Sequence, residues 1–333
     1  MTISALCRCS IVLIVLCTLS ACGSFAPSAV RSATTQPSTH TKTYGDLVVG
    51  FAQIGAESEW RTANTRSLQE TANRLGVELK FADGQQQQEK QIQAIRSFIA
   101  QRVDVIGVSP VVETGWDTVF TEVQQAGIPL ILLDRHASVP DSLFSAFIGS
   151  DFVQQGRYAC QEMVKLLNSQ GNIVVLEGTI GSAPTIDRRA GFDECLGDYP
   201  QIHVLDRQSG DFIRARGKEV MKAFLATHGS RIDALFAQND DMALGAIEAI
   251  EEYGSRPGVD IKIVSIDAVR SAFEAMIAGK LNVTIECDPL LGPPFFDTAL
   301  KLVNDQPIHK WVKSEDNIYH QDTASQELPK RQY

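Results

Sequence analysis

The sequence predicts an α/β protein with two doubly wound, Rossmann-like lobes, each built on a parallel sheet of similar size. First, from Asp46 onward, short apolar strands alternate with amphipathic helices, which is the pattern of βα units. Second, this alternation runs through the chain twice, once up to Ile148 and again up to Glu286. Third, a chain of 333 residues with 44% hydrophobic and 21% charged side chains suits two ordinary globular domains.

The first run begins with an apolar strand and a helix that carries Leu68 and Leu75 on one face and ends at Gly76. The next helix has an isoleucine stripe from Ile92 to Ile99 at spacings of three and four. The strands expected in this run are 47–53, 77–81, 103–108, 129–133 and 144–148. The helices expected around them are 60–75, the helix with the isoleucine stripe, and 116–126.

The second run repeats this order. Its expected helices are 152–167, 185–196, 212–226, 242–253 and 271–277, and its expected strands are 172–176, 202–205, 234–237, 261–266 and 282–286. A late helix, 292–303, and an irregular tail follow. Ligands of open α/β sheets bind at the carboxyl ends of the strands, so the residues directly after each strand are the candidate site.

The first 21 residues predict a signal peptide. Arg8 is their only charge, and the apolar core of residues 11–17 is too short to span a bilayer. The ending Leu19-Ser-Ala-Cys22 resembles the lipobox of bacterial lipoproteins, which implies cleavage before Cys22 and lipidation of its sulfur. An ordinary signal peptide with a cysteine near its end is the alternative. Residues 22–45, rich in Ser, Thr, Ala and Pro, are expected to form a flexible tether to the membrane.

Three cysteines remain after such processing: Cys160, Cys195 and Cys287. A disulfide between Cys160 and Cys195 is possible in an exported protein, because both fall on expected helices of the same lobe. The alternative is three buried, small hydrophobic side chains. The sequence leaves both interpretations open.

Composition and motifs exclude several functions. Forty acidic residues stand against thirty basic ones without a Lys/Arg-rich run, which excludes a nucleic-acid surface. The sequence has no phosphate-binding loop and no nucleophile elbow, and its six histidines lack metal-ligand spacing. We therefore expect no cofactor, no metal and no catalytic residue, and we do not expect an enzyme.

Strong polar side chains follow nearly every expected strand. The candidates are Glu57, Trp60, Arg61, Asp83, Asp134, Arg135, Arg188, Asn239, Asp240, Asp267 and Glu286. Carboxylate, amide and guanidinium groups can each hold two adjacent hydroxyls, and an indole can cover the C–H face of a sugar ring. This lining predicts a small neutral polyol as the ligand.

Structural roles are the alternative for each candidate. Asp83 fits a helix N-cap equally well, and Trp60 could pack between a loop and a helix. Arg61 and Arg135 could form structural ion pairs with neighbouring carboxylates. Capping alone would favour Ser and Thr more often, so the recurrence of strong polar groups at the strand ends favours a site.

Several stretches carry a resemblance to a known family: "VGFAQIGAESEWR", "IPLILLDR", "IDRRAGF", "NDDMALGAI" and "VSIDAV". From about Asp46 to Tyr333 the sequence resembles the periplasmic sugar-binding proteins of ABC transporters in the ribose-binding class, or periplasmic binding proteins of type 1. The resemblance implies two lobes that are joined by a three-segment hinge and close on a sugar. It is strongest to galactofuranose-binding members.

Position by position, the resemblance places the same candidates in the cleft, with Glu286 at a hinge crossing as the weakest. It implies discontinuous lobes, 46–148 plus 288–311 and 149–287 plus 312–333. Two departures from the family are the lipobox, in place of a plain signal peptide, and the bulky Leu290 and Leu291 after the crossing strand.

The leading hypothesis is an exported, lipid-anchored, monomeric solute-binding protein of the periplasm or cell surface. It would capture galactofuranose, or another pentose or hexose, and deliver it to the membrane subunits of an ABC permease. A sugar sensor that presents its closed form to a membrane receptor would have the same lobes. A glycosidase or sugar isomerase is the enzyme alternative and predicts turnover of the sugar. The sequence leaves open the ring form of the sugar, the permease, and whether the anchor lies in an inner or outer membrane.

Overall fold

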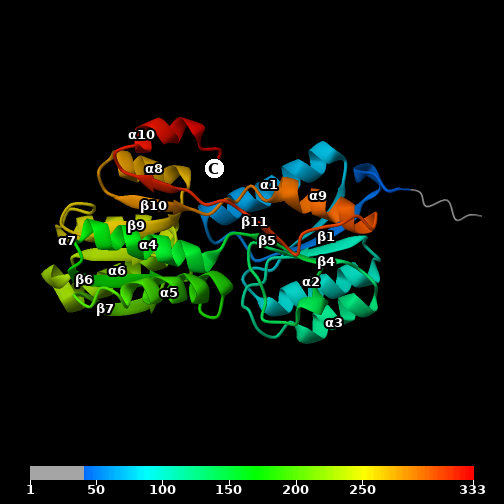
Figure 1. Cartoon of the computed structure of the whole chain (residues 1–333), viewed down its shortest axis with the longest axis horizontal. Helices are drawn as coiled ribbons and strands as arrows, with labels where there is room; N and C mark the ends of the chain where they lie inside the picture. The colour runs from blue at the N-terminus through cyan, green and yellow to red at the C-terminus, as the bar shows by residue number, and fades with distance from the viewer. Residues whose placement is uncertain (1–40) are drawn as a thin grey trace, which may run out of the picture. The chain divides into compact units, whose positions relative to one another are not determined.

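The computed structural model describes residues 41–333, so the export segment, Cys22 and most of the expected tether lie outside the described residues. Two six-stranded sheets form the framework (Figure 1). The first sheet has the order β11-β5-β4-β3-β1-β2, and its neighbouring strands are all parallel. The second has the order β12-β10-β9-β8-β6-β7, in which only β12 is antiparallel to its neighbour. This agrees with the expected pair of doubly wound sheets.

The strands and helices follow the expected alternation. The first sheet consists of β1 (Val48–Gln53), β2 (Glu78–Asp83), β3 (Val105–Val108), β4 (Leu130–Leu133), β5 (Ala146–Gly149) and β11 (Trp311–Lys313). The second consists of β6 (Gly171–Glu177), β7 (Ile202–Ser209), β8 (Ala234–Ala237), β9 (Lys262–Asp267), β10 (Val283–Glu286) and β12 (Ile318–His320). We call the parts of the chain built on these sheets the first and the second lobe.

Helices cover the sheets of both lobes. In the first lobe, α1 (Glu59–Leu75) and α9 (Gly292–Val303) lie on one face of the sheet, and α2 (Gln88–Ala100) and α3 (Asp117–Gln125) lie on the other (Figure 1). In the second lobe, α4 (Phe152–Leu166) packs on α5 (Ala183–Leu196), and α6 (Arg214–His228) packs on α7 (Asp240–Tyr253). Two further helices, α8 (Arg270–Ile277) and α10 (Ala324–Glu327), pack together near the end of the chain.

The chain passes between the two sheets three times. The passages follow β5, follow β10, and connect β11 to β12. Three connections were expected, but the expected lobe boundary at residue 311 falls inside β11, which pairs in the first sheet through Trp311–Lys313. The lobe boundaries themselves stay a prediction that the strand order supports.

The tail is where the structure adds most to the sequence prediction. An irregular tail was expected, whereas β11, β12 and α10 are ordered elements. Both strands are three residues long and lie at sheet edges, with no fully buried residue. Such short, half-exposed segments carry no hydrophobic periodicity, so their pairing depends on the sheets that they join.

The contact between α4 and α5 is unusually close and places Arg188 at the site described below. A Cβ at Gly156 would lie 2.1 Å from the carbonyl oxygen of Arg188, and a Cβ at Gly191 would lie 1.9 Å from a backbone carbonyl of α4. Cys160 of α4 and Cys195 of α5 form a disulfide. The sequence left two interpretations of these cysteines open, and the structure supports the disulfide. Cys287, the third cysteine, is free and buried.

Within residues 41–333, no helix has both the length and the apolar character needed to span a membrane.

Candidate ligand-binding site

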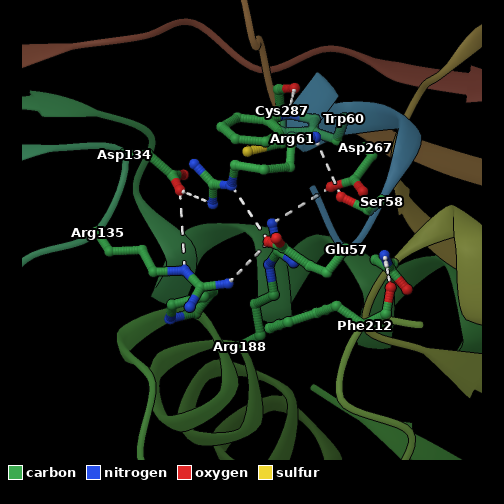
Figure 2. A pocket seen from close by; sticks show the side chains of 12 residues that line it. Glu57, Ser58, Trp60, Arg61, Asp134, Arg135, Arg188, Phe212, Asp267 and Cys287 are labelled. Atoms are coloured by element: carbon green, nitrogen blue, oxygen red, sulfur yellow. Dashed lines mark hydrogen bonds and ion pairs between the residues drawn. The ribbon is translucent and has the colours of Figure 1, made fainter. Parts of the chain in front are cut away.

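Twelve side chains line a cavity at the carboxyl ends of the strands (Figure 2). The first lobe provides Glu57, Ser58, Trp60, Arg61, Asp134 and Arg135; the second provides Pro184, Arg188, Phe212, Asn239 and Asp267; Cys287 lies in the passage after β10.

The first turn of α1 presents the residues that follow β1. Ser58 caps this helix by accepting a hydrogen bond from the backbone N–H of Arg61 over 3.1 Å. The cap fixes the direction in which Trp60 and Arg61 leave the helix. Trp60 Nε1 donates to the carbonyl oxygen of Cys287 over 2.5 Å, which ties α1 to the passage after β10.

Two carboxylates hold the guanidinium of Arg61. Its Nη2 donates to Asp134 Oδ2 over 2.6 Å, and its Nε donates to Glu57 Oε1 over 3.2 Å. The guanidinium carbon lies 4.6 Å from the centre of the Trp60 ring. Burial opposes the charge of Arg61, but Asp134 and Glu57 outweigh burial, so the pKa of Arg61 lies above its ordinary value. Arg61 is therefore charged and oriented within the wall of the cavity.

Arg135 is held less completely. Its Nη1 donates to the carbonyl oxygen of Val111 over 3.1 Å, and its guanidinium lies 3.9 Å from Glu57 and 3.8 Å from Asp134. Among residues 41–333, nothing forms a hydrogen bond with the buried atoms Arg135 Nε and Glu57 Oε2. Burial, together with the charge of Arg61, lowers the pKa of Arg135 to about 10, which leaves it protonated at neutral pH. One donor and one acceptor of the wall residues thus have no hydrogen-bond partner among the described residues.

In the second lobe, hydrogen bonds hold the guanidinium of Arg188 in the cavity wall, as they hold that of Arg61 in the first lobe. Its Nε donates to Gln155 Oε1 over 2.9 Å, its Nη1 donates to the carbonyl oxygen of Gln238 over 2.6 Å, and its Nη2 lies 3.7 Å from Asp267. Burial raises the pKa of Asp267 well above its ordinary value, and Arg188 only partly opposes this effect. The end of β9 therefore presents a carboxyl group that readily accepts a proton.

Phe212 forms an aromatic wall between two of the arginines. Its ring centre lies 5.3 Å from the guanidinium carbon of Arg135 and 6.0 Å from that of Arg188. The ring rests directly on Gly178, where a Cβ would lie only 1.8 Å from it. A glycine at position 178 is therefore required for the observed position of this wall.

Three cavity residues have backbone conformations that are unusual for residues other than glycine. The φ angles are 63° at Asp134, 62° at Phe212 and 130° at Asp267. Each such conformation costs about 1–3 kcal/mol and persists only where the surrounding structure holds it. Backbone conformations of this kind recur at functional sites.

The cavity wall contains three basic and three acidic side chains. Three arginines, Arg61, Arg135 and Arg188, face three acidic groups, Glu57, Asp134 and Asp267. Such a wall carries charges of both signs without a large excess of either, even when Asp267 is protonated. It offers a neutral ligand charge-assisted donors and acceptors on several sides.

Eight of the residues expected at the site line the cavity together: Glu57, Trp60, Arg61, Asp134, Arg135, Arg188, Asn239 and Asp267. Asn239 also caps α7, because its Oδ1 accepts from the N–H of Met242 over 3.0 Å and its Nδ2 donates to the carbonyl oxygen of Phe212 over 3.2 Å. That these residues bind a ligand remains a prediction.

Asp83 and Asp240 do not line the cavity. Asp83 is exposed and accepts from the backbone N–H of Gln85 over 2.7 Å, so it stabilises a turn. Asp240 is fully buried, and Ser265, Thr284 and the N–H of Val269 donate to its two oxygens. Its side chain is directed into the second lobe because it lies in the first turn of α7, beside β9 and β10. The position of Asp240 directly after β8 therefore does not bring its side chain to the cavity.

Glu286 also lies outside the cavity lining. Its Oε2 accepts from Asn317 Nδ2 over 2.6 Å, and its Oε1 accepts from Arg331 over 2.7 Å and from the hydroxyl of Tyr333 over 2.9 Å. Burial raises the pKa of Glu286, but the Asn317 and Arg331 contacts outweigh it, and the net pKa is below the ordinary value. Glu286 thus fixes the last passage and the tail to the end of β10.

Four lining residues were missed by sequence reasoning: Ser58, Pro184, Phe212 and Cys287. Phe212 and Cys287 closely follow β7 and β10, so the rule that pointed to the other residues could have found them. Phe212 was instead assigned to the start of a helix, but α6 begins at Arg214. Cys287 was interpreted only as a buried, small hydrophobic side chain.

Comparisons with known proteins agree with this geometry. Residues 49–291 match the family described as periplasmic binding protein domain. The chain is 43% identical to the galactofuranose-binding protein YtfQ of Escherichia coli (strain K12), over 86% of this chain and 91% of that protein. A solved structure from Mycobacterium smegmatis in complex with β-D-fucofuranose is 50% identical, with a TM-score of 0.84 over 86% of this chain and 95% of that chain.

A second solved structure is the periplasmic binding protein component of the arabinose ABC transporter from Shewanella sp. ANA-3, bound to α- and β-L-arabinofuranose. It is 43% identical, with a TM-score of 0.83 over 86% of this chain and 95% of that chain. The relatives are named as binding proteins and not as enzymes, which agrees with the expected absence of an enzymatic role. Together with the two six-stranded sheets and the cavity between them, the matches show that the chain belongs to the periplasmic binding protein family, in its type 1 class.

Proposed function

We propose that this protein captures one neutral monosaccharide in its furanose form and delivers it to an ABC permease. The observation that carries the proposal is the cavity lined by buried groups of both signs, in which Glu57 Oε2 and Arg135 Nε form no hydrogen bond among residues 41–333. A sugar hydroxyl both donates and accepts, so the hydroxyls of a sugar can satisfy an acceptor as well as a donor. A carboxylate or phosphate ligand would satisfy only the donor.

The comparisons support a furanose ring. The similar proteins are named for, or solved with, galactofuranose, β-D-fucofuranose and L-arabinofuranose. We infer that galactofuranose or a furanose of similar size fills the cavity, with Trp60 and Phe212 against its C–H groups.

Both lobes contribute to the cavity, so capture depends on their approach. An open form would expose Arg61 on one lobe and Arg188 on the other, and a sugar that contacts both would favour the closed form. A micromolar dissociation constant needs about 8 kcal/mol. Several charge-assisted hydrogen bonds of roughly 1.5–3 kcal/mol each supply this after ordering costs.

The place of the protein in the cell belongs to the same proposal. We infer export by the N-terminal segment, an anchor on Cys22, and a mature protein on the periplasmic side of a membrane or at the cell surface. The lobes would be 46–148 plus 288–311 and 149–287 plus 312–333, with the first boundary extended to include β11.

Calorimetric titration of the purified exported protein tests the proposal. The sugars are D-galactose, D-fucose, L-arabinose and D-ribose. We expect at least one of the first three to bind, and Arg135→Gln to weaken its binding at least about tenfold. The matched control is Arg96→Gln, because Arg96 forms an exposed ion pair with Glu122. Failure of every sugar to bind, or equal losses in the two variants, would exclude the proposed site.

Transport separates the permease role from a sensing role. A strain that lacks the protein should lose uptake of the bound sugar and regain it with the wild-type chain, but not with Arg135→Gln. Unchanged uptake, together with retained sugar binding, would instead favour a sensor.

A further inference from the structure

A histidine lies between two carboxylates at a contact between the lobes. His136 follows Arg135 after β4, and its Nε2 lies 2.8 Å from Asp187 Oδ2 in α5 of the second lobe. Its Nδ1 lies 3.3 Å from Oε1 of Glu113, in the segment between β3 and α3. None of these three residues lines the cavity, but Arg135 and Arg188, their neighbours in sequence, do.

Backbone contacts show that this cluster forms where the lobes touch. The N–H of Glu113 donates to the carbonyl oxygen of Gly181 in the second lobe over 2.9 Å. The carbonyl oxygen of Glu113 accepts from the N–H of Ser138 over 2.8 Å, which joins the segment after β3 to the segment after β4. Separation of the lobes would break the contact with Gly181 and the contact of His136 with Asp187.

The arrangement favours a protonated ring. A carboxylate only accepts hydrogen bonds, and neutral imidazole has a single N–H, so it can serve only one of the two carboxylates. Only the imidazolium form can donate to Asp187 and attract Glu113 at the same time. The two carboxylates face different ring nitrogens, and one metal ion cannot bind both nitrogens of a ring. The observed positions therefore fit a proton better than a metal.

We propose that His136 is a proton-operated latch, which when charged bonds to Asp187 across the lobes and holds the protein closed around its ligand. This inference rests on the proposed function, because it concerns how tightly the captured sugar is retained. It gives the protein stronger retention at mildly acidic pH and easier release as the pH rises.

The pKa shifts of the cluster support stronger retention of the ligand at mildly acidic pH. Burial lowers the pKa of His136, but the hydrogen bond and charge of Asp187 and the charge of Glu113 outweigh burial, so its net pKa is raised. The groups that face His136 are these two carboxylates and the uncharged ring of Phe147 in β5, with 6.0 Å between ring centres. Burial also raises the pKa of Glu113, so Glu113, like His136, takes up a proton more readily than it would in water.

The sign of the pH effect follows from linkage. In an open form His136 loses Asp187, and its pKa returns toward the ordinary value of about 6.5. The latch then contributes fully below that pH and is lost as the pH rises through the higher pKa of the closed form. Closure near neutral pH should therefore take up protons.

Other groups also titrate in this range, so the latch must be tested by difference. Burial raises the pKa values of Asp240 and Asp241 to about 7. Asp241 also accepts from the N–H of Glu59 across the lobes over 3.0 Å. A pH effect in the wild-type protein alone would therefore not identify His136.

The experiment compares wild type with His136→Asn and Asp187→Asn. The matched control is His320→Asn, because His320 forms a pair with Glu162 within the second lobe over 2.9 Å. Affinity for D-galactose, D-fucose and L-arabinose is measured by calorimetry between about pH 6 and pH 8.5, in buffers of different ionisation enthalpy that report proton uptake.

At the acidic end of this range, we expect wild type and His320→Asn to bind the sugar at least about threefold more tightly than His136→Asn and Asp187→Asn do. On binding the sugar, wild type and His320→Asn should also take up more protons than those two variants. All four proteins should bind alike near pH 8.5. Identical pH profiles in wild type and His136→Asn would overturn the latch. So would an affinity that depends on added Zn²⁺ and is abolished by a chelator, which would indicate a metal site instead.

A second measurement needs no sugar. Small-angle scattering of the ligand-free proteins should show a smaller radius of gyration at the acidic end for wild type than for His136→Asn, and equal radii near pH 8.5. If no sugar binds to any variant at any pH, the proposed function fails, and scattering still decides on the latch. Equal radii at every pH would overturn it.

Discussion

Asp134 Oδ2 accepts a hydrogen bond from Arg61 Nη2 over 2.6 Å and so joins the end of β4 to the first turn of α1. Both side chains are almost fully buried. This pair fixes the positions of a carboxylate and a guanidinium at one side of the cavity before a ligand binds. Much of the proposed affinity depends on this preorganisation.

Replacement of Asp134 by asparagine should weaken sugar binding at least about tenfold. The substitution keeps the shape of the side chain but removes the shorter of the two carboxylate contacts of Arg61, so the buried guanidinium reorients. Calorimetry measures the affinity, and thermal unfolding should show a lower midpoint. The matched control, Glu122→Gln, breaks an exposed ion pair with Arg96 and should change neither quantity. Full affinity in Asp134→Asn would show that the pair does not organise the site.

Gly178→Ala should weaken sugar binding although position 178 does not line the cavity. The added Cβ would lie 1.8 Å from the ring of Phe212, so the ring must move toward the space that the sugar would occupy. We expect at least about a tenfold loss of affinity.

Gly197→Ala is the control for this substitution. Its Cβ would meet nothing closer than 3.4 Å, and its φ is −56°. Equal affinities of the two alanine variants would mean that Phe212 does not contact the ligand.

Loss of the Cys160–Cys195 disulfide should lower the free energy of unfolding by about 2–4 kcal/mol. The bond joins residues 35 apart in the sequence and holds α4 against α5, where Arg188 is located. Urea unfolding of the Cys160→Ala/Cys195→Ala variant measures the effect.

Reductant provides the control for the disulfide. Wild type should be destabilised by reduction, whereas the double variant should not respond. Unfolding curves of wild type that coincide with and without reductant would contradict a stabilising disulfide.

Asp241→Asn should flatten the pH dependence of stability between about pH 4 and pH 8. Burial raises the pKa of Asp241 from an ordinary 3.8 to about 7, although the N–H of Glu59 opposes this effect. A raised carboxyl pKa contributes stability that is present below the ordinary value and is lost as the pH rises through the folded value. The rise corresponds to at most on the order of 4 kcal/mol.

Thermal unfolding at several pH values tests this prediction. In wild type the contribution of Asp241 declines with rising pH, and the asparagine variant should lack this decline. Asp260→Asn serves as the control, because Asp260 is exposed and Arg256 lowers its pKa. A decline of equal slope in wild type and Asp241→Asn would show that Asp241 ionises without cost.

The sequence predicted the fold well because most elements have a clear hydrophobic period and a clear end. Gly76 ends α1 with a φ of 76°, and β3 and β4 are buried along their whole length. The prediction was least complete in the tail, where β11 and β12 each pair through only three half-exposed residues. These strands are defined by their neighbours in the sheets, which the local sequence does not contain.

For the site, position after a strand was a good guide and residue type was a poorer one. Eight expected residues lie together in the cavity, whereas Asp83 and Asp240 have the right type and position but satisfy their own turn and helix. Phe212 was missed because an apolar residue next to a helix resembles a core residue. Its function as a wall depends on contact with Gly178, a residue 34 positions earlier in the chain.

The most direct test of the central claim is carbon-13 NMR of the protein with D-galactose, D-fucose and L-arabinose, each labelled at the anomeric carbon. The anomeric shift distinguishes furanose from pyranose rings, and free solutions of these sugars contain both. We predict that the bound signal of at least one sugar is that of a furanose, and that it disappears in Arg135→Gln. A bound pyranose signal, or a bound signal that Arg135→Gln leaves intact, would contradict the proposal of a furanose in this cavity.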